Sequence, residues 1–234
     1  MRHALLSLAV LAATALTACA PRASIPDPER ERVGRELTGQ RRWLRAAAYS
    51  GPFFGDLSKK LLTDQPAAEL DLLETAGGDR IAPPTADRIL PPGTEVRIRS
   101  VEFPTGWTIA RRIVMTPRYH PWVFLEVEGS TDPHVLVLPQ TAATFEAVRD
   151  EIDRLLVPDD PSSAFEALSA EHRDAIRAKR LVDGMTTRAV EMSWGLPERK
   201  RIDRPARTEE WTWPGGTRRA FFEEDRLVRW EPRR

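Results

Sequence analysis

The chain has 234 residues, of which 41% are hydrophobic and 30% are charged, with 35 basic and 35 acidic residues. This composition is typical of a globular protein that can bury a core without disulfides, and the charge balance argues against a dedicated nucleic-acid-binding protein. The balance is uneven, with an acidic excess between Glu126 and Asp174 and a basic excess between Arg199 and Arg234. The basic end could face phospholipid or lipopolysaccharide head groups, but a solvated Arg-rich surface is the simpler interpretation.

Residues 1–18 have the pattern of a signal peptide. Arg2 precedes an apolar run from Ala4 to Ala18, which as a helix is about 22 Å long and too short for a hydrocarbon core of about 30 Å. The alternative is a buried N-terminal helix, which would usually carry a polar face. No later apolar run is long enough to span a membrane. The sequence therefore predicts an exported chain.

The end of this run carries a second signal. Leu16-Thr17-Ala18-Cys19 resembles the bacterial lipobox, which implies cleavage before Cys19 and acylation of its thiol and new amino group. Cys19 is the only cysteine, so no internal disulfide can form, and acylation accounts for a single thiol in an exported chain. Several acyl chains would anchor the protein permanently. Because Ala20 rather than Asp follows, resemblance to the sorting rule of enterobacterial lipoproteins favours the outer membrane.

Residues 19–28 form a tether that contains three prolines. Asp27-Pro28 then has the pattern of a helix N-terminus, and we expect a helix from Glu29 to about Tyr49 with a narrow apolar stripe. Ser50-Gly51-Pro52 would end it. Residues 29–68 are therefore predicted to be an N-terminal helical segment.

Residues 69–139 carry the signals of a β-rich domain. We expect a hairpin that turns at Gly77-Gly78, a strand after the turn at residues 91–94, two strands within residues 106–129, and a last strand in "HVLVLP". Short strands at close spacing predict a small antiparallel barrel or sandwich. The opening "PPGTEVRI" resembles bacterial SH3-like barrels.

Residues 140–168 are predicted to be a helical connector. A helix from Gln140 to Val157 would place five apolar side chains on one face: Phe145, Val148, Ile152, Leu155 and Leu156. Pro158 and Pro161 would end it. We expect limited proteolysis to cut between Pro158 and Ser163 before it cuts either flanking domain.

Residues 169–234 have a regular pattern of caps and strands. Ser169 is positioned to cap a helix to about Val182, Gly184 to take the left-handed position that ends it, and Thr186 to cap a second helix that Gly195 ends. Four strands are then expected, at residues 199–204, 207–213, 218–223 and 226–231, with a turn at Pro214-Gly215-Gly216.

This last segment resembles the SmpA/OmlA (BamE) type of outer-membrane lipoprotein. The shared pattern consists of Gly184-Met185-Thr186, Val190, Gly195, Pro197, and an aromatic strand with Trp211 and Trp213. The resemblance implies two helices packed on a three-stranded antiparallel sheet over residues 169–232, in which these residues serve backbone geometry and packing. The family's characteristic leading segment is absent, so its assembly and lipid contacts do not carry over. The whole chain is predicted to be α+β, with a small antiparallel barrel or sandwich before this module.

No catalytic residue, metal ligand or cofactor site emerges from the sequence. There is no Gly-x-Ser-x-Gly motif and no cysteine apart from Cys19. His120, His134 and His172 are expected on the surface, with the first two at opposite ends of a hairpin. The carboxylate pairs Asp159-Asp160 and Glu209-Glu210 are expected in a loop or on opposite sides of a strand.

Aromatic residues alternate with arginines in the C-terminal strands, as in Trp211, Trp213, Arg218 and Phe221. They could bind a glycan or a peptide strand, although the core and rim of a sheet are the simpler interpretation. We expect Arg218 and Arg229 to form an exposed face for an anionic partner. The sequence therefore favours a non-enzymatic, outer-membrane-anchored lipoprotein that binds or assembles proteins of the Gram-negative envelope. The alternative is an envelope or peptidoglycan-modifying enzyme, or its wall-targeting subunit.

Overall fold

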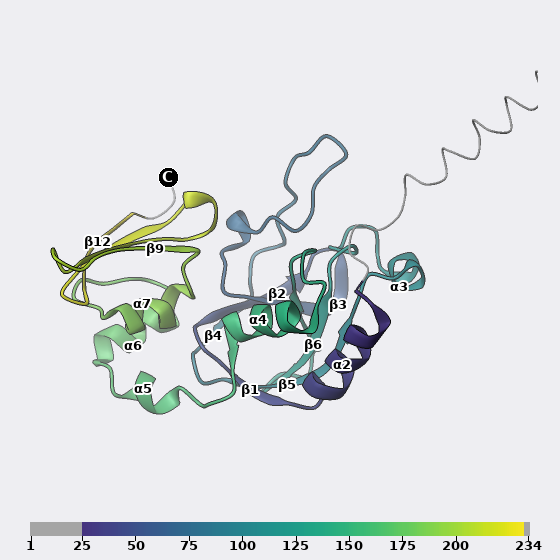
Figure 1. Cartoon of the computed structure of the whole chain (residues 1–234), viewed down its shortest axis with the longest axis horizontal. Helices are drawn as coiled ribbons and strands as arrows, with labels where there is room; N and C mark the ends of the chain where they lie inside the picture. Colours follow the sequence, from purple (N-terminus) through teal and green to yellow (C-terminus); the bar gives the residue numbers. More distant parts are fainter. Residues whose placement is uncertain (1–24, 232–234) are drawn as a thin grey trace, which may run out of the picture.

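The structure is a computed structural model that describes residues 25–231, and the predicted signal peptide and Cys19 lie outside the described residues. The described chain forms two lobes, each built from one sheet with helices packed against it (Figure 1). The α+β class is confirmed.

The larger lobe contains an eight-stranded mixed sheet. Its order is β4-β2-β3-β7-β6-β5-β1-β8, and every neighbouring pair is antiparallel except β3 and β7, which are parallel. The strands are β1 (Arg41–Leu44), β2 (Ala48–Phe53), β3 (Asp56–Thr63), β4 (Arg88–Leu90), β5 (Glu95–Glu102), β6 (Trp122–Val127), β7 (His134–Val137) and β8 (Leu156–Val157).

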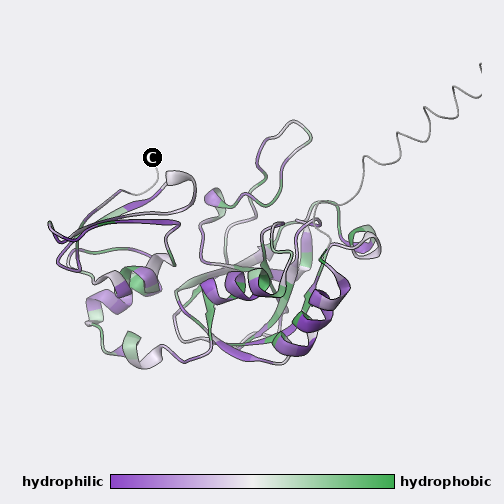
Figure 2. Cartoon of the chain, in the orientation of Figure 1, coloured by the Kyte–Doolittle hydropathy of each residue, from purple (hydrophilic) through white to green (hydrophobic). Residues whose placement is uncertain are grey.

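Two helices pack against this sheet, α2 (Asp27–Leu37) and α4 (Phe145–Leu155). Their buried side chains join those of the strands in one hydrophobic core. Figure 2 shows α2 as mostly hydrophilic, and only Val33 and Leu37 of this helix are buried. Thr144 caps α4 by accepting a hydrogen bond from the Ala147 backbone N–H at 3.1 Å. Phe145, Val148, Ile152 and Leu155 are buried, as the apolar periodicity predicted. The helix is shorter than the predicted range of Gln140 to Val157, and Leu156, expected on the same face, is buried in β8 instead.

A smaller core contains Phe53, Leu61, Leu70 and Trp122, and a long connection between β3 and β4 contributes Leu70 to it. This connection contains the short helix η2 (Ala67–Glu69) and projects from the molecule in Figure 1. The expected hairpin at Gly77-Gly78 is reduced to a turn closed by a single bridge between Glu74 and Arg80.

The C-terminal lobe consists of helices and a four-stranded antiparallel sheet in the order β12-β11-β10-β9. The helices are α5 (Ser162–Glu166), α6 (Ala170–Arg177) and α7 (Thr187–Trp194), and the strands are β9 (Arg199–Asp203), β10 (Thr208–Thr212), β11 (Arg219–Glu223) and β12 (Arg226–Glu231), with η3 (Pro214–Gly216) at the turn. Ser169 and Thr186 cap α6 and α7, as predicted. Trp211 and Trp213 are buried in the core of this lobe together with Trp194.

The predicted helix to Tyr49 is wrong beyond Leu37. Thr38 already has an extended conformation, with a ψ of 135°. Gly39 follows with a φ of 84°, and its N–H bonds to the Ile98 carbonyl at 2.7 Å. The residues that were expected to be helical instead form β1, which pairs with β5 and β8, and the start of β2, which pairs with β4. Tertiary pairing therefore overrides a weak amphipathic pattern here.

The two strands expected within residues 106–129 become one helix and one strand. Trp107 lies on the short helix α3 (Gly106–Arg111), and only β6 is a strand. Because β5, β6 and β7 share a sheet with β1, β2 and β3, the described residues form no small, purely antiparallel barrel.

Gly184 has the predicted positive φ, at 73°, but not the predicted role. Helix α6 ends at Arg177, and Lys179, with a φ of 51°, takes the left-handed position after it. Gly184 instead lies in the turn before α7, where its N–H bonds to the Leu227 carbonyl on β12 at 2.9 Å. The glycine therefore ties the helical layer to the sheet.

Candidate functional site

A groove of about 890 Å³ lies between the two lobes. The larger lobe contributes the connection after β3, the segment around His120, and the end of α4, whereas the C-terminal lobe contributes Trp194, Leu196, Glu198 and the turn after Trp213. Leucines and tryptophans alternate with charged side chains along its walls. A large concave site with apolar walls and a few polar groups is the usual form of a binding site.

A buried ion pair joins the lobes at this groove. Arg218 Nε lies 3.0 Å from each carboxylate oxygen of Glu69, and the two side chains are 5% and 2% exposed. The guanidinium carbon also lies 4.9 Å from the ring centre of Trp194 and 5.6 Å from that of Trp213. The expectation of an exposed Arg218 is therefore wrong, because its guanidinium is buried in an ion pair with Glu69 of the larger lobe.

A buried lysine makes a second link between the lobes. Lys179 Nζ donates hydrogen bonds to the carbonyls of Ala47, at 2.6 Å, and Ser193, at 2.7 Å. Burial lowers the pKa of Lys179 to about 7, since no carboxylate is hydrogen-bonded to the amine. The chain has only four lysines among 35 basic residues, but nothing in the sequence shows that this lysine is buried.

The groove carries unbalanced acidic charge. Among its lining residues, Arg80 pairs with Asp71 and Arg154 pairs with Glu151. Within residues 25–231, three lining carboxylates, those of Asp64, Glu74 and Glu198, form no such ion pair, against one lining cation, Arg118, that is also without one. The groove can therefore attract a segment that carries basic and apolar side chains.

His120 lines the groove but is buried rather than exposed. Its Nδ1 lies 2.9 Å from the Leu138 carbonyl, and its Nε2 lies 3.2 Å from Gln140 Nε2. Burial is the first cause that lowers its pKa. The expected surface position is wrong because this ring connects β6 to the segment after β7.

His134 is also buried and forms a pair that the sequence did not reveal. Ser50 Oγ lies 2.9 Å from His134 Nε2, and His134 Nδ1 lies 3.0 Å from the Asp132 carbonyl. This is the geometry of a nucleophile and its base, and burial lowers the pKa of His134. However, Ser50 is 2% and His134 0% exposed, and neither lines the groove or the smaller apolar cavity of about 520 Å³ beside it. The pair has no path to a substrate and instead satisfies two buried polar groups.

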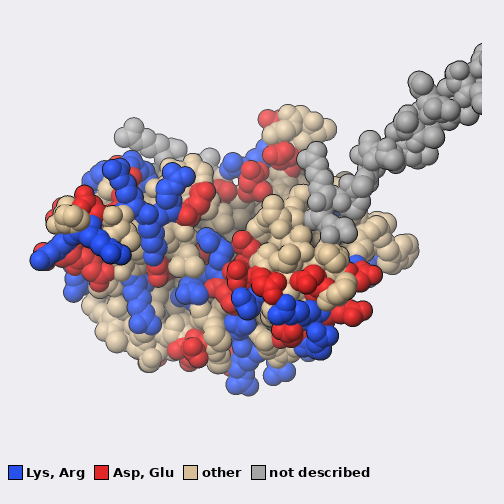
Figure 3. Space-filling model, viewed as in Figure 1, with Lys and Arg blue, Asp and Glu red and all other residues tan. Residues whose placement is uncertain are grey.

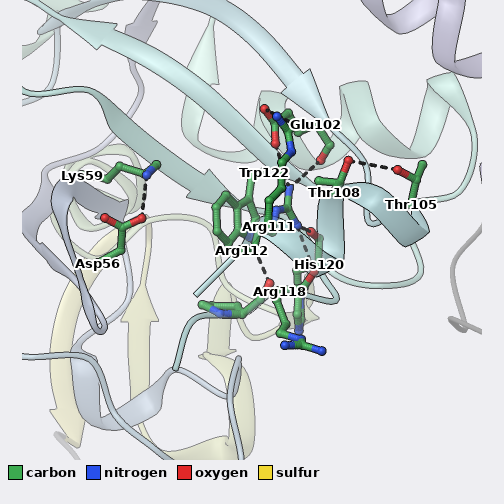
Figure 4. A network of polar contacts seen from close by, with 11 residues as sticks. Asp56, Lys59, Glu102, Thr105, Thr108, Arg111, Arg112, Arg118, His120 and Trp122 are labelled. Atoms are coloured by element: carbon green, nitrogen blue, oxygen red, sulfur yellow. Dashed lines mark hydrogen bonds and ion pairs between the residues drawn. The ribbon is translucent and has the colours of Figure 1, made fainter. Parts of the chain in front are cut away.

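A second buried arginine organises the segment between β5 and β6 (Figure 4). Arg112 donates to the carbonyls of Arg118, at 3.0 Å, and His120, at 2.7 Å, and its guanidinium lies 3.6 Å above the ring of Trp122. Burial lowers its pKa to about 10, while Glu102 opposes that shift. Its hydrogen bonds satisfy backbone carbonyls on both sides of α3, at Glu102 before it and at Arg118 and His120 after it.

The residues of the predicted C-terminal motif are mostly structural. Met185, Val190, Pro197, Trp211 and Trp213 are buried, and Gly195 ends α7 with a φ of 81°. Arg229 is exposed, as expected, and its guanidinium lies 3.6 Å from the ring centre of Phe221.

The remaining polar candidates are dispersed. His172 lies half-buried in α6, and Asp159-Asp160 is exposed. Glu209 accepts a hydrogen bond from Trp211 Nε1 at 2.7 Å, whereas Glu210 pairs with Arg219. Within residues 25–231, no group of three or more His, Cys, Asp or Glu residues is placed to hold a metal ion.

Comparison of the chain with protein-family models, with curated proteins and with solved structures found no match. Within the described range, no helix combines the length and hydropathy needed to cross a bilayer.

Proposed function

We propose that the protein is a non-enzymatic, lipid-anchored binding factor of the Gram-negative envelope that holds a partner protein in its interlobe groove. The groove carries this proposal, because it combines apolar walls with the unpaired carboxylates of Asp64, Glu74 and Glu198. The partner segment would therefore be extended or helical, with basic and apolar side chains. The lipobox ending at Cys19 supports the anchor, and Ala20 supports the outer membrane.

The C-terminal lobe has the SmpA/OmlA type of fold in this proposal. Support comes from the order of its elements, in which α6 and α7 precede an antiparallel sheet. One departure is clear: the sheet has four strands rather than the family's three, because β9 adds an edge beside β10. The family's binding surfaces are not carried over.

A photo-crosslinking amino acid at Leu196, which lines the groove, tests the proposal in intact envelopes. We expect a discrete crosslinked protein that is lost on charge reversal at Glu74 and Glu198. Glu128→Lys is the matched control, since Glu128 is exposed, lies outside the groove and forms no ion pair among the described residues. If the groove position crosslinks to no protein, or if Glu128→Lys abolishes the crosslink equally, the groove is not the binding site.

An envelope enzyme is the alternative, although the one nucleophile–base geometry described above, Ser50 with His134, is buried away from the groove. If this pair were catalytic, Ser50→Ala would abolish hydrolysis of peptidoglycan or lipid by the purified protein. We expect no such hydrolysis, and we expect Ser50→Ala to retain the crosslinked partner.

A further inference from the structure

Exposed apolar side chains gather on one part of the larger lobe. Of the eight large apolar side chains that are exposed within residues 25–231, six come from α3, the turns that follow it, and the β2–β3 hairpin. Leu57 is 87%, Trp107 76% and Val114 69% exposed, and the other three are Ile113, Met115 and Tyr119. We call these six residues the α3 patch. A concentration of exposed apolar side chains in one region is typical of an interaction site.

The α3 patch is held rigidly rather than left unpacked. Arg112 fixes the ends of its segment through the hydrogen bonds in Figure 4, and Thr108, Ile109 and Thr116 are buried beneath it. Thr116 bonds back to the Ile113 carbonyl through its hydroxyl, at 2.6 Å, and this turn leaves Val114 and Met115 exposed. The fold therefore presents these side chains to solvent in a fixed arrangement.

The β2–β3 hairpin abuts the same turn. The Gly55 N–H lies 3.5 Å from the Met115 carbonyl, and a Cβ at Gly55 would lie 3.1 Å from Met115 Cβ. Leu57, two residues further on at the start of β3, is the most exposed of the six side chains.

The sequence around the α3 patch is basic, and one of its arginines, Arg111, pairs with Glu102 at 3.5 Å. No acidic residue occurs between Phe103 and His120, whereas Arg111 and Arg118 flank the apolar side chains. Figure 3 shows mostly uncharged surface at the end of the molecule where Figure 1 places α3. Tryptophan, tyrosine and arginine among aliphatic side chains are the composition of a surface that lies in the head-group region of a bilayer.

The start of the described chain lies at the same end. Ile25 and Phe103 belong to one buried cluster, and Figure 1 shows α2 and α3 together at that end of the larger lobe. Only residues 20–24 separate Cys19 from Ile25, and five residues reach at most about 18 Å when extended. A lipid on Cys19 would therefore keep this end of the protein close to the bilayer.

We infer that the α3 patch docks onto the phospholipid surface to which Cys19 is anchored, so that the protein has a fixed orientation on the membrane. This inference rests on the lipid anchor of the proposed function. The acyl chains hold the protein at the bilayer, and the patch sets which face is turned toward it.

The test uses the full lipidated chain in vesicles of phosphatidylethanolamine and phosphatidylglycerol. Because Cys19 is the only native cysteine and is acylated in the proposal, a nitroxide can be attached to Val114→Cys alone. Val228→Cys is the matched control, since Val228 is also an exposed valine but lies on β12 of the other lobe. We expect collisions with an aqueous nickel reagent to fall severalfold at position 114 on reconstitution, with no change at position 228.

Each result is decisive. A label at position 114 that stays as accessible as the one at position 228 in anchored protein overturns the docking inference but leaves the anchor intact. Release of the chain by carbonate washing, with no acyl mass on Cys19, refutes the anchor itself. Protection at position 114 in native envelopes but not in pure lipid vesicles means that a protein covers the α3 patch, which also overturns the inference.

Discussion

Lys179 Nζ in the C-terminal lobe donates a hydrogen bond of 2.6 Å to the Ala47 carbonyl in the larger lobe. The adjacent Ala47 N–H bonds to the Met192 carbonyl at 2.7 Å. The lobes are thus joined through backbone groups of one alanine, as well as through the Glu69–Arg218 ion pair.

The stability of the protein should rise with pH because of Lys179. Its pKa is about 7 when folded and ordinarily 10.5, so between these values the unfolded chain binds the proton and the folded chain does not. The free energy of unfolding should therefore increase by up to about 1.4 kcal/mol per pH unit in this window, and it should be independent of this group below pH 7. Urea unfolding at pH 7.5 and 9.5 measures the effect. Lys179→Met should reduce the difference between the two pH values, while Lys200→Met, at an exposed lysine, should preserve it.

Removal of one partner of the Glu69–Arg218 pair should be costly. Glu69→Gln leaves the Arg218 charge buried without a counter-ion, and such changes cost about 3–5 kcal/mol. The double variant Glu69→Leu with Arg218→Met should recover much of this loss, because both desolvated charges are gone. Denaturant unfolding of Glu69→Leu alone, Arg218→Met alone and the double variant measures the coupling. Simple additivity would show that the pair does not act as a unit.

Substitution by alanine should lower the stability of the protein more at Gly195 than at Gly184. Gly184→Ala strains a left-handed residue with no atom within 4 Å of the new Cβ, which costs about 1–2 kcal/mol. Gly195 has φ 81° and ψ −176°, a conformation almost confined to glycine, and a Cβ there would collide with the Asp64 carboxylate. Thermal melts should rank Gly195→Ala below Gly184→Ala. The reverse order would contradict this account of the α7 terminus.

Acid should destabilise the protein through its buried histidines. Burial lowers the pKa of both His120 and His134, so below the ordinary value of 6.5 the unfolded chain takes up protons before the folded chain does. The free energy of unfolding should therefore be unaffected by these groups above pH 6.5 and should fall as the pH drops through their folded pKa values. The decrease in the free energy of unfolding between pH 6.5 and pH 5 should be smaller in His134→Gln than in the native protein. It should be unchanged in the control His172→Gln, because His172 lies in α6, away from this pair.

The segment between the lobes should be the first site of proteolysis. Pro158, Asp159 and Asp160 are exposed between β8 and α5, and exposed loops are cut before packed elements. Because the Ala47, Lys179 and Glu69 contacts cross between the lobes, the two fragments should elute together on gel filtration. First cleavage within residues 96–138 would contradict the prediction, as would separation of the fragments at neutral pH.

The features predicted correctly from the sequence are mostly local. The caps at Ser169 and Thr186, the apolar face of α4, and the strands after Gly195 each depend on neighbours within a few residues. The turn at Pro214-Gly215-Gly216 is equally local.

The features that were missed depend on distant partners. β1 becomes a strand because β5 and β8 lie on either side of it. Lys179 and Arg218 are buried because carbonyls and a carboxylate from the other lobe satisfy them. Nothing in the local sequence distinguishes these residues from surface charges, so the groove between the lobes could not be predicted from the sequence.

The strand order of the larger sheet also sets when it can form. β1 pairs with β5 and β8, so Trp43 gains its first partner only when Glu95 is available and its second only when Val157 is available. β3 likewise waits for β7, which pairs with it in parallel after a long intervening segment. Contacts this distant in sequence slow folding. A chain that emerges from its N-terminus can pair β2 with β3 and β4 early, but one edge of β3 stays unpaired until β7 has appeared and one edge of β1 until residue 157 has appeared. Unpaired strand edges of this kind are prone to aggregation.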